Sequence, residues 1–205
     1  MKKISFRRLV PALVLSAVMP LAFAGPVTIF EDDFDRADGN SVGNGWYEIE
    51  GIAADVAITA NTVRLRSQAA GINGTATTPD AALTRTISTV GVNSVAVAFT
   101  WSPYTASESS DFLNLAWKKS ADVTYTNVGS LALGGQTGYT FASFHLGAMA
   151  SNTSIDLRFW TNVNANNEGA FLNSVKVTAV PEPGSIALMS LALAGMGLVA
   201  RRKRK

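Results

Sequence analysis

Residues 94–101 read Ser-Val-Ala-Val-Ala-Phe-Thr-Trp, and this stretch gives the clearest indication of the fold. The large apolar residues Val95, Val97 and Phe99 stand at every second position, and smaller residues separate them. A period of two is typical of a β-strand that buries one face. The stretch therefore predicts a strand whose odd-numbered side chains point into a core.

The same pattern extends in both directions from this stretch. In residues 154–160, apolar side chains alternate with Asp156, Arg158 and Trp160, and other short runs rich in Val, Ile, Thr and aromatic residues are separated by Gly, Asn, Asp and Ser. About ten strands without crossover helices predict an all-β fold, an antiparallel β-sandwich or jelly roll, flanked by an N-terminal signal helix and a C-terminal membrane helix. The candidate strands are Val27–Phe30, Trp46–Glu50, Val56–Ala60, Thr62–Arg66, Leu83–Ser88, Ser94–Trp101, Phe112–Lys118, Gly129–Leu133, Tyr139–Leu146, Ser154–Trp160 and Ala170–Thr178.

Charge is distributed unevenly along the 205 residues, whose formal net charge is +2. Residues 1–24 hold four basic and no acidic residues, and residues 181–205 hold five basic residues and one acidic residue. Residues 25–180 hold eight basic and fourteen acidic residues, so this body is anionic. A nucleic-acid partner is disfavoured, because phosphate binding needs a clustered cationic face. The lack of cysteine and the single histidine, His145, exclude disulfides, a thiolate nucleophile and a multi-histidine metal centre.

Residues 1–24 have the order of a secretory signal peptide. A basic start precedes the apolar stretch Leu9–Phe23, and Ala22 and Ala24 form an A-x-A site before Gly25. This order predicts export with cleavage after Ala24, and a short N-terminal anchor helix is the alternative. The predicted organisation is a signal peptide at 1–24, a β-sandwich domain at 25–179 and a C-terminal signal at 180–205.

The C-terminal residues combine two prolines, a short apolar segment and a basic tail. The segment Ile186–Ala200 would form a helix of about 22 Å at about 1.5 Å per residue, which is shorter than a full membrane span. A basic tail holds its end of such a helix on the cytoplasmic side. This arrangement predicts a transient membrane stop, with a plain single-pass anchor as the alternative. The tail consists of Arg201, Arg202, Lys203, Arg204 and Lys205.

The triplet Pro181, Glu182 and Pro183, together with the apolar segment and the basic tail, resembles the PEP-CTERM sorting signal. The resemblance covers residues 180–205. It implies recognition by an exosortase, a membrane cysteine protease or transpeptidase that removes the tail near this triplet. Proteins with this signal occur in Gram-negative bacteria that make extracellular polysaccharide. The resemblance therefore implies a transient stay in the inner membrane, followed by the cell surface or the exopolysaccharide matrix.

A second resemblance covers scattered parts of the body. Residues 30–39, Phe-Glu-Asp-Asp-Phe-Asp-Arg-Ala-Asp-Gly, followed by Gly43-Asn44-Gly45-Trp46, are similar to the opening of concanavalin A-like and related carbohydrate-binding jelly rolls of bacterial surface proteins. Residues 111–118 and 168–178 resemble later strands of the same group. The resemblance implies a fold and leaves the ligand open.

Five carboxylates crowd into residues 31–38, and a hard cation is a natural partner for them. The spacing departs from the EF-hand loop, because Ala37 occupies the third ligand position. Asn173 has the parity of the apolar residues in the last strand, so we expect it to face inward, where an amide needs partners. In related jelly rolls, acidic residues of the first strand and an amide of the last often share a structural Ca²⁺. The resemblance thus implies a calcium site at Asp32, Asp33 and Asn173, and a solvated acidic turn is the alternative.

The candidates for stacking on sugar rings are the aromatic residues Trp160, Tyr104, Trp46 and Tyr47. Trp160 is the best of them, because its position in the alternating strand predicts an outward-facing ring. The first functional hypothesis is therefore a non-catalytic surface or matrix protein that binds a glycan and requires no cofactor. A structural or adhesive protein without a defined ligand also remains open.

A secreted jelly-roll glycoside hydrolase is the alternative from another class. Glu48 and Glu50 lie on one face of a predicted strand about 6.6 Å apart, near the separation that retaining glycosidases use. The run Glu48-Ile49-Glu50 resembles the start of the E-x-D-x-x-E motif of jelly-roll β-glucanases. Ala53 stands in place of the motif's final carboxylate, and hydrolysis needs two carboxylates in different roles. We therefore predict no catalytic residues.

Overall fold

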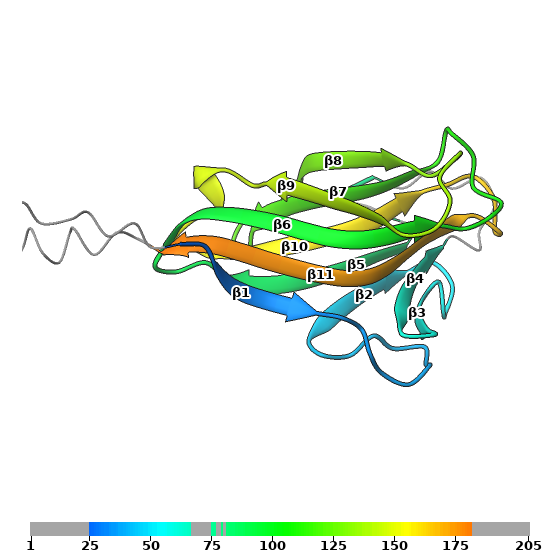
Figure 1. Cartoon of the computed structure of the whole chain (residues 1–205), viewed down its shortest axis with the longest axis horizontal. Coiled ribbons are helices and arrows are strands. Elements are labelled where there is room, and N and C mark those ends of the chain that lie inside the picture. The colour runs from blue at the N-terminus through cyan, green and yellow to red at the C-terminus, as the bar shows by residue number, and fades with distance from the viewer. Residues whose placement is uncertain (1–24, 67–74, 77–78, 80, 182–205) are drawn as a thin grey trace, which may run out of the picture. The chain divides into compact units, whose positions relative to one another are not determined.

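The computed structural model describes residues 25–66, 75–76, 79 and 81–181. It contains eleven strands in these ranges, and each overlaps one of the predicted strands (Figure 1). The all-β prediction is confirmed, while the predicted signal helix and membrane helix lie outside the described residues. Within the described ranges, no helix is both long and apolar enough to cross a membrane. The strands are β1 (Val27–Asp32), β2 (Trp46–Glu50), β3 (Val56–Thr59), β4 (Thr62–Arg66), β5 (Ala81–Ser88), β6 (Val92–Pro103), β7 (Phe112–Lys119), β8 (Thr126–Ala132), β9 (Thr140–His145), β10 (Ser154–Asn162) and β11 (Gly169–Pro181), with a short 3₁₀ helix at Ala148–Ala150.

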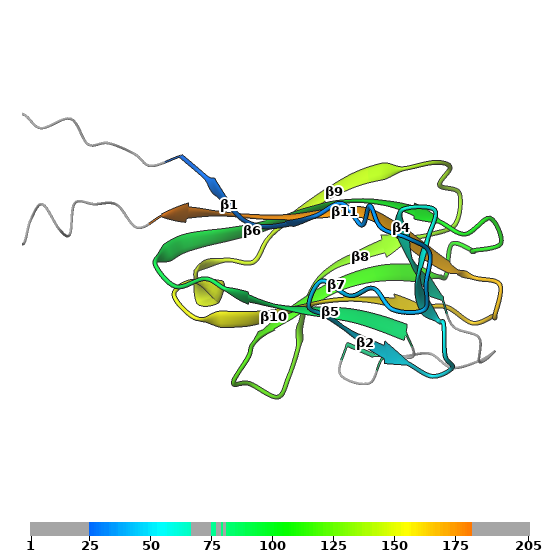
Figure 2. The same ribbon diagram turned by 90° about the horizontal axis from the view of Figure 1, so that it is seen from below.

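The strands form two antiparallel sheets that face each other (Figure 2). The six-stranded sheet has the order β3-β4-β11-β6-β9, and its sixth strand, β1, pairs with β11 outside this path. The five-stranded sheet has the order β2-β5-β10-β7-β8. The long strand β11 pairs with β6 along one edge, and with β4 and then β1 along the other. The predicted antiparallel sandwich is thus confirmed.

The core lies between the sheets and follows the predicted alternation. Val95, Val97 and Phe99 of β6 are buried against the inner side chains of β10. The ring of Phe99 meets that of Phe159 edge to face, with 4.9 Å between the centroids. Such pairs stabilise a core beyond simple burial by about 0.5–1.5 kcal/mol. The period-two pattern therefore places one face of each central strand in the core and leaves the other on an outer surface.

A β-bulge in β11 changes the outcome for one predicted residue. Leu172 and Val175 are both buried although they are three positions apart, and the register opposite β6 shifts between Leu172 and Ser174. The extra residue is Asn173, and a bulge of this kind reverses which alternate side chains face the core. The predicted inward orientation of Asn173 is therefore wrong. The same bulge turns Phe171 to the outer face, opposite Ser102.

Candidate functional site

The two outer faces of the sandwich differ in how far their side chains are covered. Two of the predicted aromatic residues, Tyr47 and Trp160, lie on the outer face of the five-stranded sheet. Tyr47 is 68% exposed at the edge strand β2, whereas Trp160 is only 7% exposed in the central strand β10. The predicted outward direction of Trp160 agrees with its pairing to Ala82 and Asn114, but its ring is buried.

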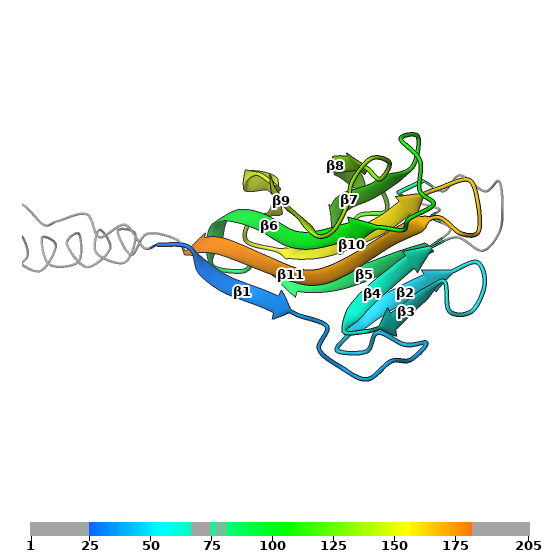
Figure 3. The ribbon, with the colours of Figure 1, turned by 45° about the vertical axis from the view of Figure 1, so that its right-hand side comes forward.

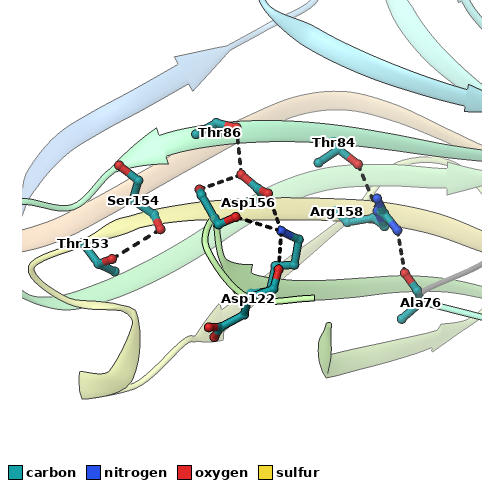
Figure 4. Close-up of polar contacts among 10 residues, drawn as sticks. Ala76, Thr84, Thr86, Asp122, Thr153, Ser154, Asp156 and Arg158 are labelled. Carbon is teal, nitrogen blue, oxygen red and sulfur yellow. Dashed lines mark hydrogen bonds and ion pairs between the residues drawn. The ribbon is translucent and has the colours of Figure 1, made fainter. Parts of the chain in front are cut away.

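A polar network closes the centre of this face (Figure 4). Asp156 accepts hydrogen bonds from the hydroxyls of Thr86 and Ser120, both at 2.8 Å, and pairs with Lys118 at 2.8 Å. Burial would raise the pKa of Asp156, but these donors outweigh it and hold the pKa below its usual range. Lys118 also donates to the carbonyl of Asp122 at 2.9 Å. The network therefore ties the loop after β7 down onto the sheet.

Arg158 completes the closure beside this network (Figure 4). Its guanidinium lies 3.9 Å from the ring centroid of Tyr125, and it donates to Thr84 at 3.0 Å and to the carbonyl of Ala76 at 2.7 Å. A cation in this position stabilises a partly buried ring by about 0.5–2 kcal/mol. Among the predicted sugar-stacking residues, Tyr47 alone is open to solvent on this side.

Trp46 is buried in the core and contacts the acidic segment at residues 31–38. Its ring packs against Phe30, Phe34 and Phe159, with centroids 5.6 to 6.4 Å apart. Its indole N–H donates to Asp32 at 2.8 Å. A buried ring whose polar atom is already bonded has a structural role, so Trp46 is not available to a sugar.

Asp32 is surrounded by donors from its own chain. Its carboxylate accepts from the backbone N–H of Phe34, the amide of Asn44, the indole of Trp46 and the guanidinium of Arg36. Burial would raise the pKa of Asp32, but these hydrogen bonds outweigh it and lower the pKa. The cation beside this carboxylate is thus Arg36. The other two predicted calcium ligands have different surroundings, because Asp33 accepts from the N–H of Asp35 and Asn173 lies in the β11 bulge.

The outer face of the six-stranded sheet carries a group of aromatic side chains that we call the aromatic face, made of Tyr104, Tyr139, Phe141 and Phe171. Tyr139 is 56% exposed and Phe141 is 69% exposed, and Tyr104 and Phe171 are half-buried. The rings of Tyr104 and Phe171 stack with 4.6 Å between centroids and 11° between planes. These residues come from β9, β6 and β11 and the segments next to them, which lie side by side in the sheet (Figure 3).

The register explains how the aromatic face is assembled. Phe141 lies opposite Thr100, and Phe171 lies opposite Ser102. Residues on the outer side of β6 are therefore small, and the rings of the two neighbouring strands stand on either side of them. A pocket of about 260 Å³ opens beside this face. It is lined by Pro103, Tyr104, Thr105, Ser107, Leu133, Gly135, Gln136, Thr137 and Gly138. Polar groups next to exposed rings are the arrangement that sugar ligands require.

Two arginines of β4 border the aromatic face. Arg64 lies directly opposite Phe171, and Arg66 lies directly opposite Gly169. The N–H of Tyr104 donates to the carbonyl of Gly169 at 2.9 Å, so Tyr104 and Arg66 flank a residue that has no side chain. Partial burial raises the pKa of the Tyr104 phenol, and Arg64 and Arg66 oppose this shift.

Sequence reasoning identified Tyr104 but missed Tyr139, Phe141, Phe171 and the two arginines. The alternation around Phe141 contained a usable signal, because Ala142 and Phe144 mark the inner side of that strand. No comparable signal existed for Phe171, since the bulge at Asn173 hides its direction.

The two glutamates considered for catalysis bind the backbone of neighbouring loops. Glu48 accepts from the N–H of Val42 at 2.5 Å, and Glu50 accepts from the N–H of Val56 at 2.7 Å. Both carboxylates thus serve to fix local chain direction.

Comparison with known proteins identifies a sorting motif at the C-terminal end and solved structures with a similar fold. Residues 179–205 match the PEP-CTERM protein-sorting motif, which confirms the resemblance inferred for residues 180–205. None of the curated proteins matches the chain. The CBM22-1 xylan-binding domain of Paenibacillus barcinonensis Xyn10C is similar at 12% identity and a TM-score of 0.52, over 78% of this chain and 99% of that domain.

Two further structures are similar at comparable identity. The N-terminal CBM22-1–CBM22-2 tandem domain of the same Xyn10C aligns at 11% identity and a TM-score of 0.51, over 78% of this chain and 47% of that one. A family 29 carbohydrate-binding module aligns at 10% identity and a TM-score of 0.47, over 75% and 88% of the two chains. At these identities the likeness to the two CBM22 structures concerns the fold alone. The chain therefore combines a PEP-CTERM sorting motif at residues 179–205 with a β-sandwich of the kind found in carbohydrate-binding modules.

Proposed function

We propose that this protein is a non-catalytic component of an extracellular polysaccharide matrix, which it binds through its aromatic face. Export and a transient stay in the membrane follow from the sorting motif at residues 179–205. An exosortase-type protease is the partner that would remove the tail, and the cell surface or matrix of a Gram-negative bacterium is the destination.

The main support for glycan binding is that aromatic rings outside the core are exposed to solvent. Tyr139 and Phe141 leave more than half of their surface in water, which is unfavourable for large apolar groups unless a partner covers them. The stacked pair of Tyr104 and Phe171 continues the same surface. The apolar faces of sugar rings stack on such side chains, while backbone and hydroxyl groups near the pocket supply hydrogen bonds.

The test is a binding measurement on residues 25–181, whose two sheets enclose their own core. Polysaccharide from the producing bacterium is titrated in affinity electrophoresis and calorimetry. Replacing both Tyr139 and Phe141 by alanine should weaken binding at least about fivefold, at about 0.5–1.5 kcal/mol for each ring contact. The matched control is Tyr47→Ala, which removes an equally exposed ring from the other sheet.

Equal binding by the double variant and the wild type would move the site away from the aromatic face. Absence of binding by the wild type would favour a structural or adhesive role without a defined ligand. The hydrolase alternative predicts new reducing ends in the same incubations. We expect none, because Glu48 and Glu50 already hold backbone N–H groups.

A further inference from the structure

Arg64 and Arg66 are two neighbouring cations on one side of the edge-proximal strand β4. At about 3.3 Å per residue, their Cα atoms lie about 6.6 Å apart on the same face. The ion pairs formed among the described residues use Arg36, Lys118 and Lys176, and neither of these two arginines is part of one. Two like charges so close together repel each other unless an anion lies between or above them.

The hydrogen bonding of the two guanidinium groups is also incomplete. Arg64 donates to the carbonyl of Ala54 at 2.7 Å through one terminal nitrogen, and its side chain also hydrogen-bonds to the phenol of Tyr104. The Nε atoms of Arg64 and Arg66 are buried and have no partner in the part of the chain that the structure describes. A guanidinium carries five N–H donors, and its planar fork fits a carboxylate with two parallel hydrogen bonds. The buried Nε atoms are closed to solvent, so an anionic group would accept hydrogen bonds from the terminal N–H groups of the pair that Ala54 and Tyr104 do not use.

The position of these donors relates them to the aromatic face. Tyr139 directly precedes Thr140, which lies opposite Trp101 of β6. The next residue of β6, Ser102, lies opposite Phe171, and Phe171 lies opposite Arg64. A chain lying across the adjacent strands β9, β6, β11 and β4 would therefore pass from the start of β9 near Tyr139 to Phe171 and then to Arg64. The distance from β9 to β4 is three strand spacings, or about 14 Å. An extended polymer can thus contact the rings and the arginines together. The surrounding body is anionic, with fourteen acidic and eight basic residues, so this cationic edge is a local exception to it.

We propose that the aromatic face is specific for polysaccharides that carry carboxylate groups, such as polymers of uronic acids. Sugar rings stack on Phe171 and Tyr139, and a sugar carboxylate lies at the guanidinium groups of Arg64 and Arg66. This inference rests on the proposed glycan-binding function and adds the class of ligand. The charge also orients the polymer, because the carboxylate must reach the β4 side of the sheet.

The experiment compares charged polymers with their neutral esters. Residues 25–181 are titrated with polygalacturonate, alginate and hyaluronate, and with the methyl ester of each. We expect at least one acidic polymer to bind about tenfold more tightly than its ester, since a hydrogen bond to a charged group contributes about 1.5–3 kcal/mol. The preference should shrink as salt is raised from 50 to about 500 mM, whereas binding of the ester should stay nearly constant.

Variants assign the preference to the arginines. Arg64→Gln and Arg66→Gln should each reduce the preference, and the double variant should bind acid and ester equally. Arg66→Lys keeps the charge but loses the planar fork, so part of the preference should remain. The control Lys119→Gln removes a cation from the other sheet and should leave the preference intact. Unfolded variants are recognised by their melting curves, and the salt series on the wild type gives an answer without any substitution.

The outcomes separate this inference from the function on which it rests. If every acid and its ester bind equally, or if the double variant keeps the wild-type preference, the specificity is wrong while glycan binding stands. If no polymer binds and matrix polysaccharide does not bind either, glycan binding itself is wrong. If matrix polysaccharide binds but its carboxyl-reduced form binds equally well, the carboxylate inference alone is overturned.

Discussion

Asp111 and Asp32 are both buried carboxylates, and their surroundings act on them in opposite ways. Asp111 is 1% exposed, and one of its oxygens has no donor among the described residues. Burial raises the pKa of Asp111; the N–H of Glu108 opposes the rise, and the nearby carboxylates of Glu168 and Glu108 add to it. Asp32, by contrast, is held ionised by the donors around it. The two residues thus predict opposite contributions to the dependence of stability on pH.

Replacing Asp111 by asparagine should stabilise the protein at neutral pH. Because the pKa of Asp111 is raised in the folded state, the native protein binds more protons than the unfolded chain just above the unfolded pKa, and stability falls there as pH rises. An amide keeps the acceptor for the Glu108 N–H and removes the charge. We expect a Tm increase of about 2–4 °C at pH 7, for about 1 kcal/mol, and almost none at pH 3. The exposed residue Asp35, changed to asparagine, is the control. A Tm difference that is the same at both pH values would contradict this account.

The surroundings of Asp32 also bear on the calcium hypothesis, which remains a prediction. A Ca²⁺ ion at Asp32 would have to displace Arg36 and the donors of Asn44 and Trp46. We therefore expect the Tm to change by less than about 1 °C between excess Ca²⁺ and excess chelator, since a ligand that binds the folded state would raise it. A Tm that rises with Ca²⁺ and falls on chelation would instead support the predicted calcium site. The low pKa of Asp32 also means that its stabilising effect is lost as pH falls through that pKa.

At the scale of the elements, Gly169 determines how β11 begins. Its φ is +153°, and a Cβ there would lie 2.3 Å from the carbonyl oxygen of Leu65 in the adjacent strand β4. Gly169→Ala should therefore lower the free energy of unfolding by about 1–3 kcal/mol, which thermal unfolding measures. Gly39→Ala is the matched control, because a Cβ at Gly39 meets no atom within 4 Å. Equal losses in the two variants would exclude a steric cause at the β11–β4 pairing.

The strands could be predicted because the alternation of apolar and polar residues within each strand reflects which of its side chains are buried. The alternation in β6 and β10 gave the inner faces correctly, since Val97 and Leu157 are both fully buried. What failed depended on contacts between elements. The bulge at Asn173 follows from how β11 fits β6. The burial of Trp160 arises in a central strand between Ala82 and Asn114, which come from distant parts of the chain. The alternation within a strand predicts on which side of the sheet a ring lies. How far that ring is exposed depends on the other parts of the chain that cover it.

The aromatic face depends on the same kind of long-range assembly. Tyr104 and Phe171 are far apart in the chain, and they stack because β6 and β11 pair along nearly their whole length. Arg64 joins them through the β4–β11 register. No local pattern contains this information. The sequence predicted that exposed aromatic side chains would form a sugar-binding surface. Its position on the six-stranded sheet could be found only from the order in which the strands pair.

At the scale of the whole molecule, the small net charge conceals two cationic ends and an anionic body. With the ends removed, the fourteen acidic and eight basic residues of 25–180 leave a protein of net charge −6. The C-terminal cluster belongs to the matched sorting motif, and the N-terminal cluster belongs to the predicted signal peptide. Positive residues beside a membrane segment stay on the cytoplasmic side. The net charge of the full chain therefore includes the predicted targeting segments. The net charge of the body is the one expected for the exported protein.

This division predicts the mass of the mature protein. Expressed in a bacterium that holds the matching sorting protease, the extracellular form should begin at Gly25 and lack Arg201–Lys205, which intact-mass spectrometry detects. Alanines at Pro181, Glu182 and Pro183 should leave the chain in the membrane fraction, because the apolar segment would keep its basic anchor. The surface variant Val123→Ala should be processed like the wild type. If the mature surface protein retains Arg201–Lys205, the motif acts as a plain anchor, and the body would then bind its polysaccharide while still attached to the membrane.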